Sequence, residues 1–193
     1  MGWTCFYDNV GLSIDDTLRK EFTDTGPNGA QWRVIDSATR GSQWYAILEY
    51  TGVGEAPKYS GMVCLVKRSK RSGEFCYKDI GEAAGPNASH APKRLIDKLD
   101  ILAPIAPDDD SYGAKWAREW RKRCRDNAAA KANRFKPFKG AIVRFGGSTP
   151  EYVLVESAGQ RRGWYVRMLN GHGTGSLFRA SARQLSKALL VKD

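Results

Sequence analysis

The segment KWAREWRKRCRDN (115–127) is the part of the chain whose residue types could do chemistry, because it concentrates arginine and lysine. An arginine guanidinium presents its donors in a fixed fork that suits bidentate contacts to phosphate or carboxylate oxygens. A helix that lays such side chains along a nucleic-acid backbone binds by charge and reads few bases. A solvated basic surface has the same composition, so the placement of the side chains must decide between the two.

A helix over residues 111–134 separates the two classes of side chain in this segment. At about 100° per residue, Trp116, Trp120 and Cys124 fall on one side, which we expect to face the core. Arg123 falls on the same side, where it could pair with an acidic group. The wheel places five cations together on the opposite side, which we expect to face water: Lys115, Arg118, Arg121, Lys122 and Arg125.

A second basic segment, AGQRRGWYVR (158–167), combines cations with aromatic side chains. Arg161 and Arg162 fall in a predicted hairpin loop, and strand alternation places Tyr165 and Arg167 on one face of the following strand. The tryptophan before Tyr165 falls on the other face and is predicted to be core. Basic loops beside aromatic side chains suit phosphate contact and base stacking, although an ordinary solvated loop has the same composition.

The charges of the chain are unevenly distributed around its net charge of +10. Residues 1–110 carry 13 Lys/Arg and 16 Asp/Glu, residues 111–139 carry 10 and 2, and residues 140–193 carry 8 and 3. Solubility alone does not require this sorting. It indicates a partner of opposite sign, which is either nucleic acid (DNA or RNA) or an acidic protein surface.

Other residue types that could do chemistry do not form a recognisable pattern. Asp79, Glu82 and His90 could form a metal or acid–base cluster, but their spacing lacks an HExxH register or a cysteine partner. The glycine-rich GHGTG (171–175) lacks the lysine and the following helix of a phosphate-binding loop. The sequence therefore predicts a non-enzymatic protein with no catalytic residue, no metal site and no cofactor. A metal-dependent hydrolase that uses Asp79, Glu82 and His90 is a further alternative, which would require tightly bound metal.

The four cysteines, Cys5, Cys64, Cys76 and Cys124, show no C-x-x-C spacing. The start of the chain does not resemble a signal peptide, and no apolar run approaches the ~18 residues of a membrane helix. We therefore expect a cytoplasmic protein that does not act at a membrane. Its cysteines should stay reduced and act as small core residues.

The elements that must position these residues follow from periodicity and turn signals. In the first part we predict a helix over 13–22 and another over 92–102, with strands at 2–8, 31–39, 42–51 and 61–68. Short links favour antiparallel pairing, with helix on one face of the sheet. Residues 75–92 are predicted to be irregular.

The second part predicts short strands at 141–147, 151–157, 163–169 and 189–192, separated by glycine-rich turns. Such strands form a small β-barrel or curled sheet, SH3-like in size. The predicted fold class is α+β: an antiparallel sheet with packed helices, a long basic helix, then the small barrel. The predicted parts are an acidic α+β domain (1–110), a basic amphipathic connector (111–136) and a basic β domain (137–193).

Three segments, MGWT (1–4), YKDIGEAAGP (77–86) with APKRLIDKL (91–99), and WAREWRKRCR (116–125), resemble an uncharacterised protein family carried by phages, prophages and conjugative elements. The resemblance spans most of residues 1–126. The family tends to have acidic or cysteine residues after Gly85-Pro86, where this chain has NASH (87–90). The resemblance implies a mobile-element accessory protein inside a bacterial host cell, and it implies no activity or catalytic residue.

The sequence thus predicts a nucleic-acid-binding accessory protein of a phage or mobile element that contacts phosphates through the basic helix and the loops of the β domain. The alternative is an anti-defence inhibitor, such as an anti-CRISPR or anti-restriction protein, that binds a host protein through its charged surface. The predicted contact residues are Lys115, Arg118, Arg121, Lys122, Arg125, Arg161, Arg162, Tyr165 and Arg167.

Overall fold

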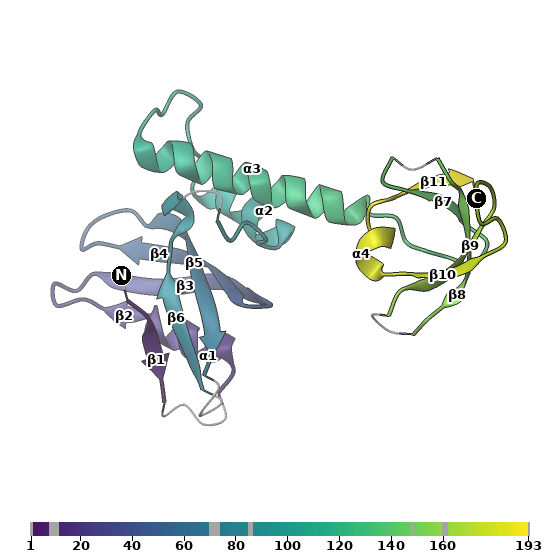
Figure 1. The fold of residues 1–193 in the computed structure, drawn as a ribbon. Coiled ribbons are helices and arrows are strands. Elements are labelled where there is room, and N and C mark those ends of the chain that lie inside the picture. The colour runs from purple at the N-terminus through teal and green to yellow at the C-terminus, as the bar shows by residue number, and fades with distance from the viewer. Residues whose placement is uncertain are drawn as a thin grey trace. The chain divides into compact units, whose positions relative to one another are not determined.

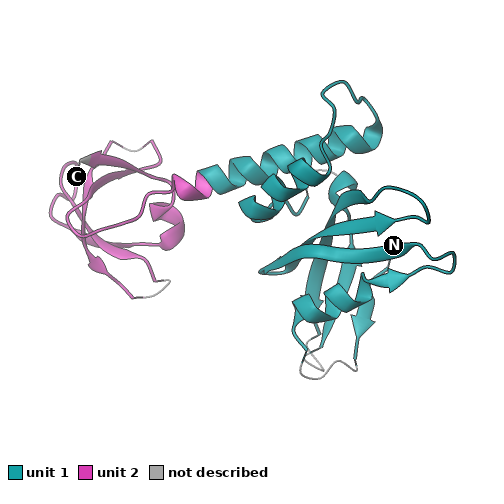
Figure 2. Ribbon diagram, turned by 180° about the vertical axis from the view of Figure 1, so that it is seen from behind, with its two compact units in different colours: residues 1–129 teal, residues 130–193 magenta. Residues whose placement is uncertain are grey.

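The computed structural model describes residues 2–7, 12–69, 74–84, 87–147, 149–159 and 162–192. The chain divides into two compact units, unit 1 (1–129) and unit 2 (130–193), coloured separately in Figure 2. The boundary falls within the last turns of a long helix, so most of the segment 111–136 belongs to unit 1. The whole is an α+β protein with antiparallel sheets.

The described strands of unit 1 form one antiparallel sheet in the order β1-β6-β5-β4-β3-β2 (Figure 1). The elements are, in chain order, β1 (Thr4–Phe6), α1 (Ile14–Glu21), β2 (Asp24–Thr25), β3 (Gln31–Arg40), β4 (Gln43–Thr51), β5 (Lys58–Arg68), β6 (Phe75–Asp79), η1 (Glu82–Ala84), α2 (Lys93–Leu102) and α3 (Tyr112–Ala132). The predictions for α1, β3, β4, β5, α2 and α3 are confirmed to within a few residues. The prediction for 75–92 is wrong for β6, which pairs with both β1 and β5.

The sheet of unit 1 is covered on both faces, which corrects the expectation of helix on one face. Alternate residues of β4 explain this: Trp44 packs into the core beneath α1, whereas Tyr45 and Ile47 pack against α2 and α3. Successive side chains of a strand point to opposite faces, so a strand that is apolar at consecutive positions must be buried on both.

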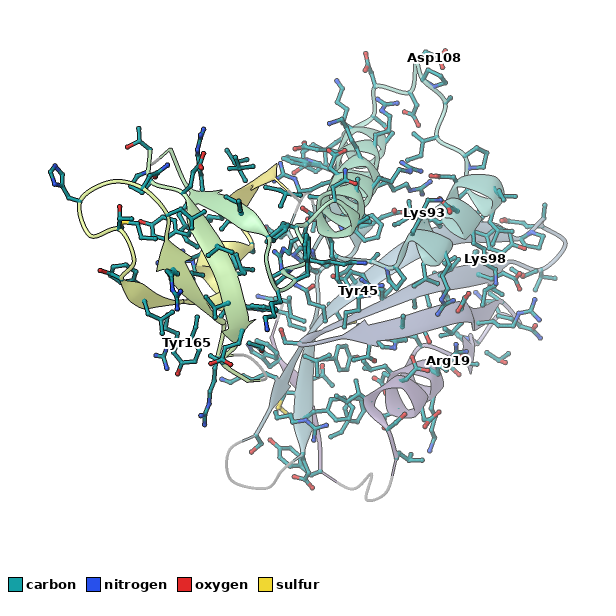
Figure 3. The ribbon with its side chains drawn as sticks, turned by 90° about the vertical axis from the view of Figure 1, so that its right-hand side faces the viewer. Arg19, Tyr45, Lys93, Lys98, Asp108 and Tyr165 are labelled. Carbon is teal, nitrogen blue, oxygen red and sulfur yellow. A yellow bond between two sulfur atoms is a disulfide. The ribbon has the colours of Figure 1, made fainter. Side chains whose placement is uncertain are left out.

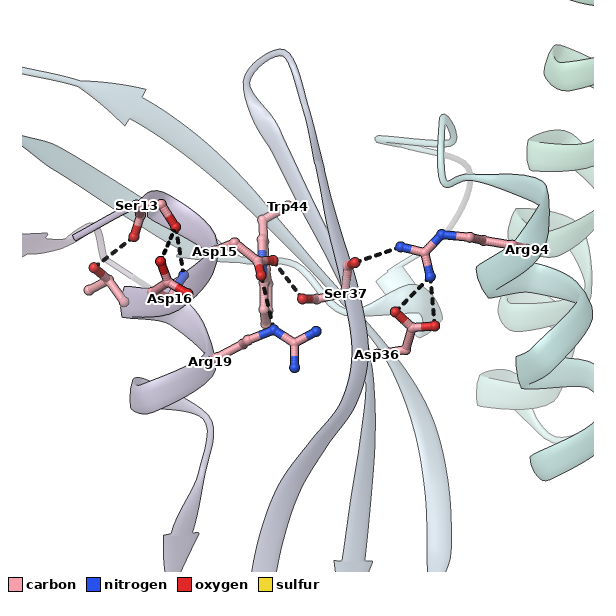
Figure 4. Close-up of polar contacts among 9 residues, drawn as sticks. Ser13, Asp15, Asp16, Arg19, Asp36, Ser37, Trp44 and Arg94 are labelled. Carbon is pink, nitrogen blue, oxygen red and sulfur yellow. Dashed lines mark hydrogen bonds and ion pairs between the residues drawn. The ribbon is translucent and has the colours of Figure 1, made fainter.

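Polar contacts fasten α1 and α2 to β3 from opposite faces (Figure 4). The Asp15 carboxylate of α1 accepts hydrogen bonds from the Ser37 hydroxyl at 2.5 Å and from the Trp44 indole N–H at 2.9 Å. The Arg94 guanidinium of α2 donates to both carboxylate oxygens of Asp36 at 2.6 Å. Burial raises the pKa of Asp15, but the hydrogen bonds from Ser37 and Trp44 more than offset it, so the pKa lies below its ordinary value.

The expectation of four reduced cysteines is wrong for Cys5 and Cys76, which form a disulfide between β1 and β6. The two residues lie directly opposite each other in the antiparallel register, where Cβ atoms are close enough to be bridged. Cys64 and Cys124 are free and buried, as predicted. Burial raises the pKa of the Cys124 thiol to about 11, which keeps it protonated near neutral pH.

The described strands of unit 2 form an antiparallel sheet in the order β10-β9-β8-β7-β11 that curls around its own core (Figures 1 and 2). Its elements are β7 (Ile142–Phe145), β8 (Tyr152–Ser157), β9 (Trp164–Met168), β10 (Leu177–Ala180), α4 (Ala182–Leu185) and β11 (Ala188–Lys192). The core contains Val143, Leu154, Val166 and Leu185. β10 and α4 were not predicted from the sequence.

Candidate nucleic-acid interface

Helix α3 buries Trp120 and Cys124 of its predicted apolar side, whereas Trp116 is only partly buried. Trp120 and Cys124 are 2% and 1% exposed and pack with α2 and β4. The Trp120 indole N–H donates a hydrogen bond to the Ala88 carbonyl oxygen at 3.3 Å. The two residues therefore anchor the helix to unit 1 and do not act as stacking surfaces for bases.

Arg121 does not face water, which corrects its placement on the outer side of α3. Its side chain is only 5% exposed and its guanidinium donates to both carboxylate oxygens of Glu82, at 3.1 and 3.0 Å. It also contacts Asp100 at 3.3 Å and the Ala103 carbonyl oxygen at 2.8 Å. A helical wheel shows directions around the helix but not which directions are covered, and here η1 and the end of α2 cover the side of Arg121.

Four other basic side chains of α3 pair with acidic residues of the protein itself, whereas Lys131 in its last turn is exposed and forms no ion pair among the described residues. Lys115 lies 3.5 Å from Asp110, Lys122 lies 3.1 Å from Asp126, and Arg123 lies 3.6 Å from Glu119. Arg125 pairs with Asp100.

The guanidinium of Arg118 bonds to backbone carbonyl oxygens instead of a carboxylate. It reaches those of Ala106 and Asp109, each at 2.7 Å. The structure also brings Arg118, Arg121 and Arg125 together with Asp100 around a cavity of about 280 Å³. The expected continuous cationic face of α3 is therefore largely occupied by ion pairs with nearby acids and by hydrogen bonds to carbonyl oxygens.

The outer face of unit 2 presents cations in a different arrangement. Along β9 the odd-numbered Tyr165 and Arg167 are exposed and the even-numbered Val166 and Met168 are buried, which confirms the predicted alternation. Tyr165, labelled in Figure 3, lies directly opposite Arg179 of β10.

The neighbouring cross-strand pair, Arg167 opposite Leu177, is also exposed on both strands. Tyr165, Arg167, Leu177 and Arg179 thus form a block in which the two arginines occupy one diagonal. Diagonal neighbours on paired strands are within about 8 Å, a spacing that long side chains can bridge. We call these four residues the β9–β10 face.

The charges of unit 2 lack matching acids. Residues 130–193 contain 12 Lys/Arg and 3 Asp/Glu. Within the described part of this unit, the ion pair formed is that of Arg144 with Glu151. Its other described basic residues whose side chains can be placed are all exposed: Lys131, Arg134, Lys136, Lys139, Arg162, Arg167, Arg179, Arg183 and Lys187.

The loop residues of the prediction have different outcomes. Arg162 is exposed just before β9, whereas Arg161 lies outside the described residues. Sequence reasoning missed Arg179 because LFRA (177–180) is short and follows glycine-rich turns. The signal that could have found it is the arginine that follows an apolar residue in LFRA, as Arg167 follows Val166 in β9, which indicates a second strand with an outward-facing cation.

The structure does not form the metal or acid–base cluster considered above for Asp79, Glu82 and His90. The carboxylates of Glu82 and Asp79 instead accept hydrogen bonds from other parts of unit 1. Both oxygens of Glu82 accept from Arg121, and one also accepts from the Gly61 backbone N–H at 3.0 Å. The Asp79 carboxylate accepts from the Gly81 N–H at 2.9 Å, and burial raises its pKa. No cluster of three possible ligands occurs among the described residues.

Comparisons with known protein families, with curated proteins and with solved structures find no match to this chain. Within the described residues, no helix has both the length and the apolar character needed to cross a membrane.

Proposed function

We propose that the protein is a non-enzymatic nucleic-acid-binding accessory protein of a phage or mobile element, and that unit 2 makes the contact. The observation that carries the proposal is the β9–β10 face, where Arg167 and Arg179 are exposed beside Tyr165 without an acidic partner among the described residues. Two guanidinium groups at this spacing suit adjacent phosphates, and the aromatic ring offers a stacking surface. Contact is mainly to phosphates.

Helix α3 has a smaller role in this proposal than its composition suggests. Exposed ion pairs such as Lys122–Asp126 contribute only about 0–1 kcal/mol each, so they can open. A phosphate that binds there must compete with a carboxylate already in place. Uncompensated cations bind the same phosphate without that competition, which favours unit 2.

We further propose that unit 2 is an SH3-like barrel. Its five short antiparallel strands, their order and the short helix α4 between β10 and β11 support this. Small β-barrels commonly present a curved outer sheet and loops to a ligand. The β9–β10 face occupies such a position.

The test is a salt series of binding, measured by fluorescence anisotropy with labelled single-stranded and duplex oligonucleotides. Replacing Arg167 and Arg179 with glutamine removes two phosphate contacts, so the slope of log affinity against log salt should become shallower by about 1.4–1.8. The matched control is Lys122→Gln with Arg123→Gln, which removes the same charge from paired residues of α3. Its slope should change much less.

An unchanged slope in the β9–β10 variant would contradict the assignment of this face. If the unaltered protein binds no nucleic acid even at low salt, the nucleic-acid proposal fails. The anti-defence inhibitor then becomes the leading alternative. A nuclease-treated pull-down from host lysate would identify the protein partner that this alternative requires.

A further inference from the structure

A groove in unit 2 combines apolar walls with hydroxyl and cationic groups. It has a volume of about 390 Å³ and is lined by Arg134, Phe135, Pro137, Ser157, Trp164 and Leu185, among others. Volumes of about 300–1,000 Å³ are typical of sites that take small molecules or single chemical groups. All the lining residues belong to unit 2.

The groove is built by elements that are held firmly together. A Cβ on Gly163 would overlap the Ala180 carbonyl oxygen, so the start of β9 presses closely against the end of β10. The Ser181 side chain and the Gln184 side chain cap the following helix α4 reciprocally. Leu185 of this helix is only 2% exposed, so it forms part of the groove floor.

The lining residues offer the contacts that a nucleobase makes. Trp164 and Phe135 are partly exposed aromatics, which can stack on a planar ring. Arg134 is exposed at the rim, and no carboxylate is among the described residues that line the groove.

Two further exposed cations are sequence neighbours of residues that line the groove. Arg162 directly precedes Gly163, and Arg183 lies on α4, and both are exposed. Trp164 is paired with Ala180 next to the pair Tyr165–Arg179, and its side chain lies on the opposite face of the sheet from Tyr165. An anionic chain at the groove therefore meets several exposed cations, whereas a neutral or basic peptide would find no complementary charge.

We propose that this groove takes one unpaired nucleobase and that unit 2 therefore prefers single-stranded nucleic acid over duplex. The inference rests on the proposed nucleic-acid function and adds to it a preference for single strands over duplexes. Bases in a duplex are stacked and paired, so their faces are not accessible to Trp164 and Phe135. In a single strand one base can leave the stack at small cost while its phosphates contact Arg134 and the neighbouring exposed cations Arg162 and Arg183.

The experiment uses the full chain and three labelled probes of equal length: a single strand, the duplex of that strand, and a strand in which every base is replaced by an abasic site. Stacking one base on an aromatic side chain raises affinity by a factor of about 5–150. The intact single strand should therefore bind at least about fivefold more tightly than the abasic strand, which carries the same charge. Polyglutamate should compete poorly.

Two exposed cations provide matched variants that do not disturb the core. Arg134→Gln should weaken binding of the single strand several-fold more than binding of the duplex. Lys136→Gln, two residues further on and not among the residues lining the groove, should weaken both probes equally.

Equal affinity for the intact and abasic strands, or effective competition by polyglutamate, would overturn the base site. The same result, combined with a shallower salt slope in the β9–β10 variant, would leave the proposed function standing. Absence of binding to all three probes would overturn both.

Discussion

Gly163 lies where the loop between β8 and β9 meets the end of β10. Its φ of +91° is in the region that only glycine adopts freely, and an added Cβ would overlap the Ala180 carbonyl oxygen. The Gly163 carbonyl group is also held in place, because its oxygen accepts a hydrogen bond from the Ala158 N–H at 2.9 Å. The residue therefore sets the shape of the groove and the direction of β9.

Replacing Gly163 with alanine should lower the free energy of unfolding of unit 2 by more than about 2 kcal/mol, because backbone strain and steric overlap act together. Urea unfolding followed by circular dichroism would measure the loss. Gly175→Ala is the matched control: its φ is +87°, but nothing lies within 4 Å of the added Cβ. It should lose only the strain, about 1 kcal/mol. Equal losses in the two variants would contradict the role given to the Ala180 contact.

At the scale of elements, α3 is held on unit 1 by a buried polar contact as well as by apolar packing. Glu82 of η1 receives donors from Arg121 of α3 and from the Gly61 backbone of β5, so one carboxylate joins three elements. A Cβ on Gly61 would come within 2.9 Å of the Glu82 carboxylate, which explains why this position of β5 has no side chain. The basic character of α3 thus serves the fold at Arg121.

Replacing Arg121 with methionine should lower the free energy of unfolding by about 3–5 kcal/mol, because Glu82 is left buried without its counter-charge. Adding Glu82→Gln should recover part of the loss, since the neutral amide costs less to bury. Urea unfolding of the single and double variants would measure both values. Lys122→Met, which changes an exposed residue next to Arg121, is the control and should change stability by less than about 1 kcal/mol. A double variant that is less stable than Arg121→Met would contradict this account.

At the scale of the whole molecule, charge is divided between the two units. Unit 1 holds most of the acidic residues and pairs many of its described cations with them, whereas unit 2 has 12 basic residues for 3 acidic ones. Such an excess raises the local attraction for polyanions and speeds their association. This division, and not the basic helix alone, is what directs the functional proposal to unit 2.

All four cysteines, and the disulfide that two of them form, lie in unit 1. The Cys5–Cys76 bond closes a sequence separation of 71 residues in unit 1, and unit 2 contains no cysteine. Reduction with a phosphine should lower the stability of unit 1 by about 2–4 kcal/mol and leave unit 2 unchanged. Hydrogen exchange measured peptide by peptide, with and without the reductant, would show faster exchange in β1 and β6. A change of similar size in β7–β11, or none in either unit, would contradict the prediction.

Local patterns in the sequence determined the elements whose signal is contained within them. These elements were predicted by patterns that depend on neighbours a few positions apart. The patterns were the helical period and capping residue of α1 and the strand character of β3, β4 and β9. The excess of positive charge after residue 110 was also readable from composition alone. Tyr165 and Arg167 were placed on one face for the same reason.

Only the tertiary structure decided which charges remain available. Arg121 meets Glu82 across 39 positions, Cys5 meets Cys76 across 71, and Tyr165 meets Arg179 through the register of β9 and β10. Periodicity orients a side chain relative to its own helix or strand, but its partner depends on how distant elements pack. The same residue type is therefore a buried anchor at Arg121 and, at Arg179, an exposed cation that forms no ion pair with the residues that the structure describes.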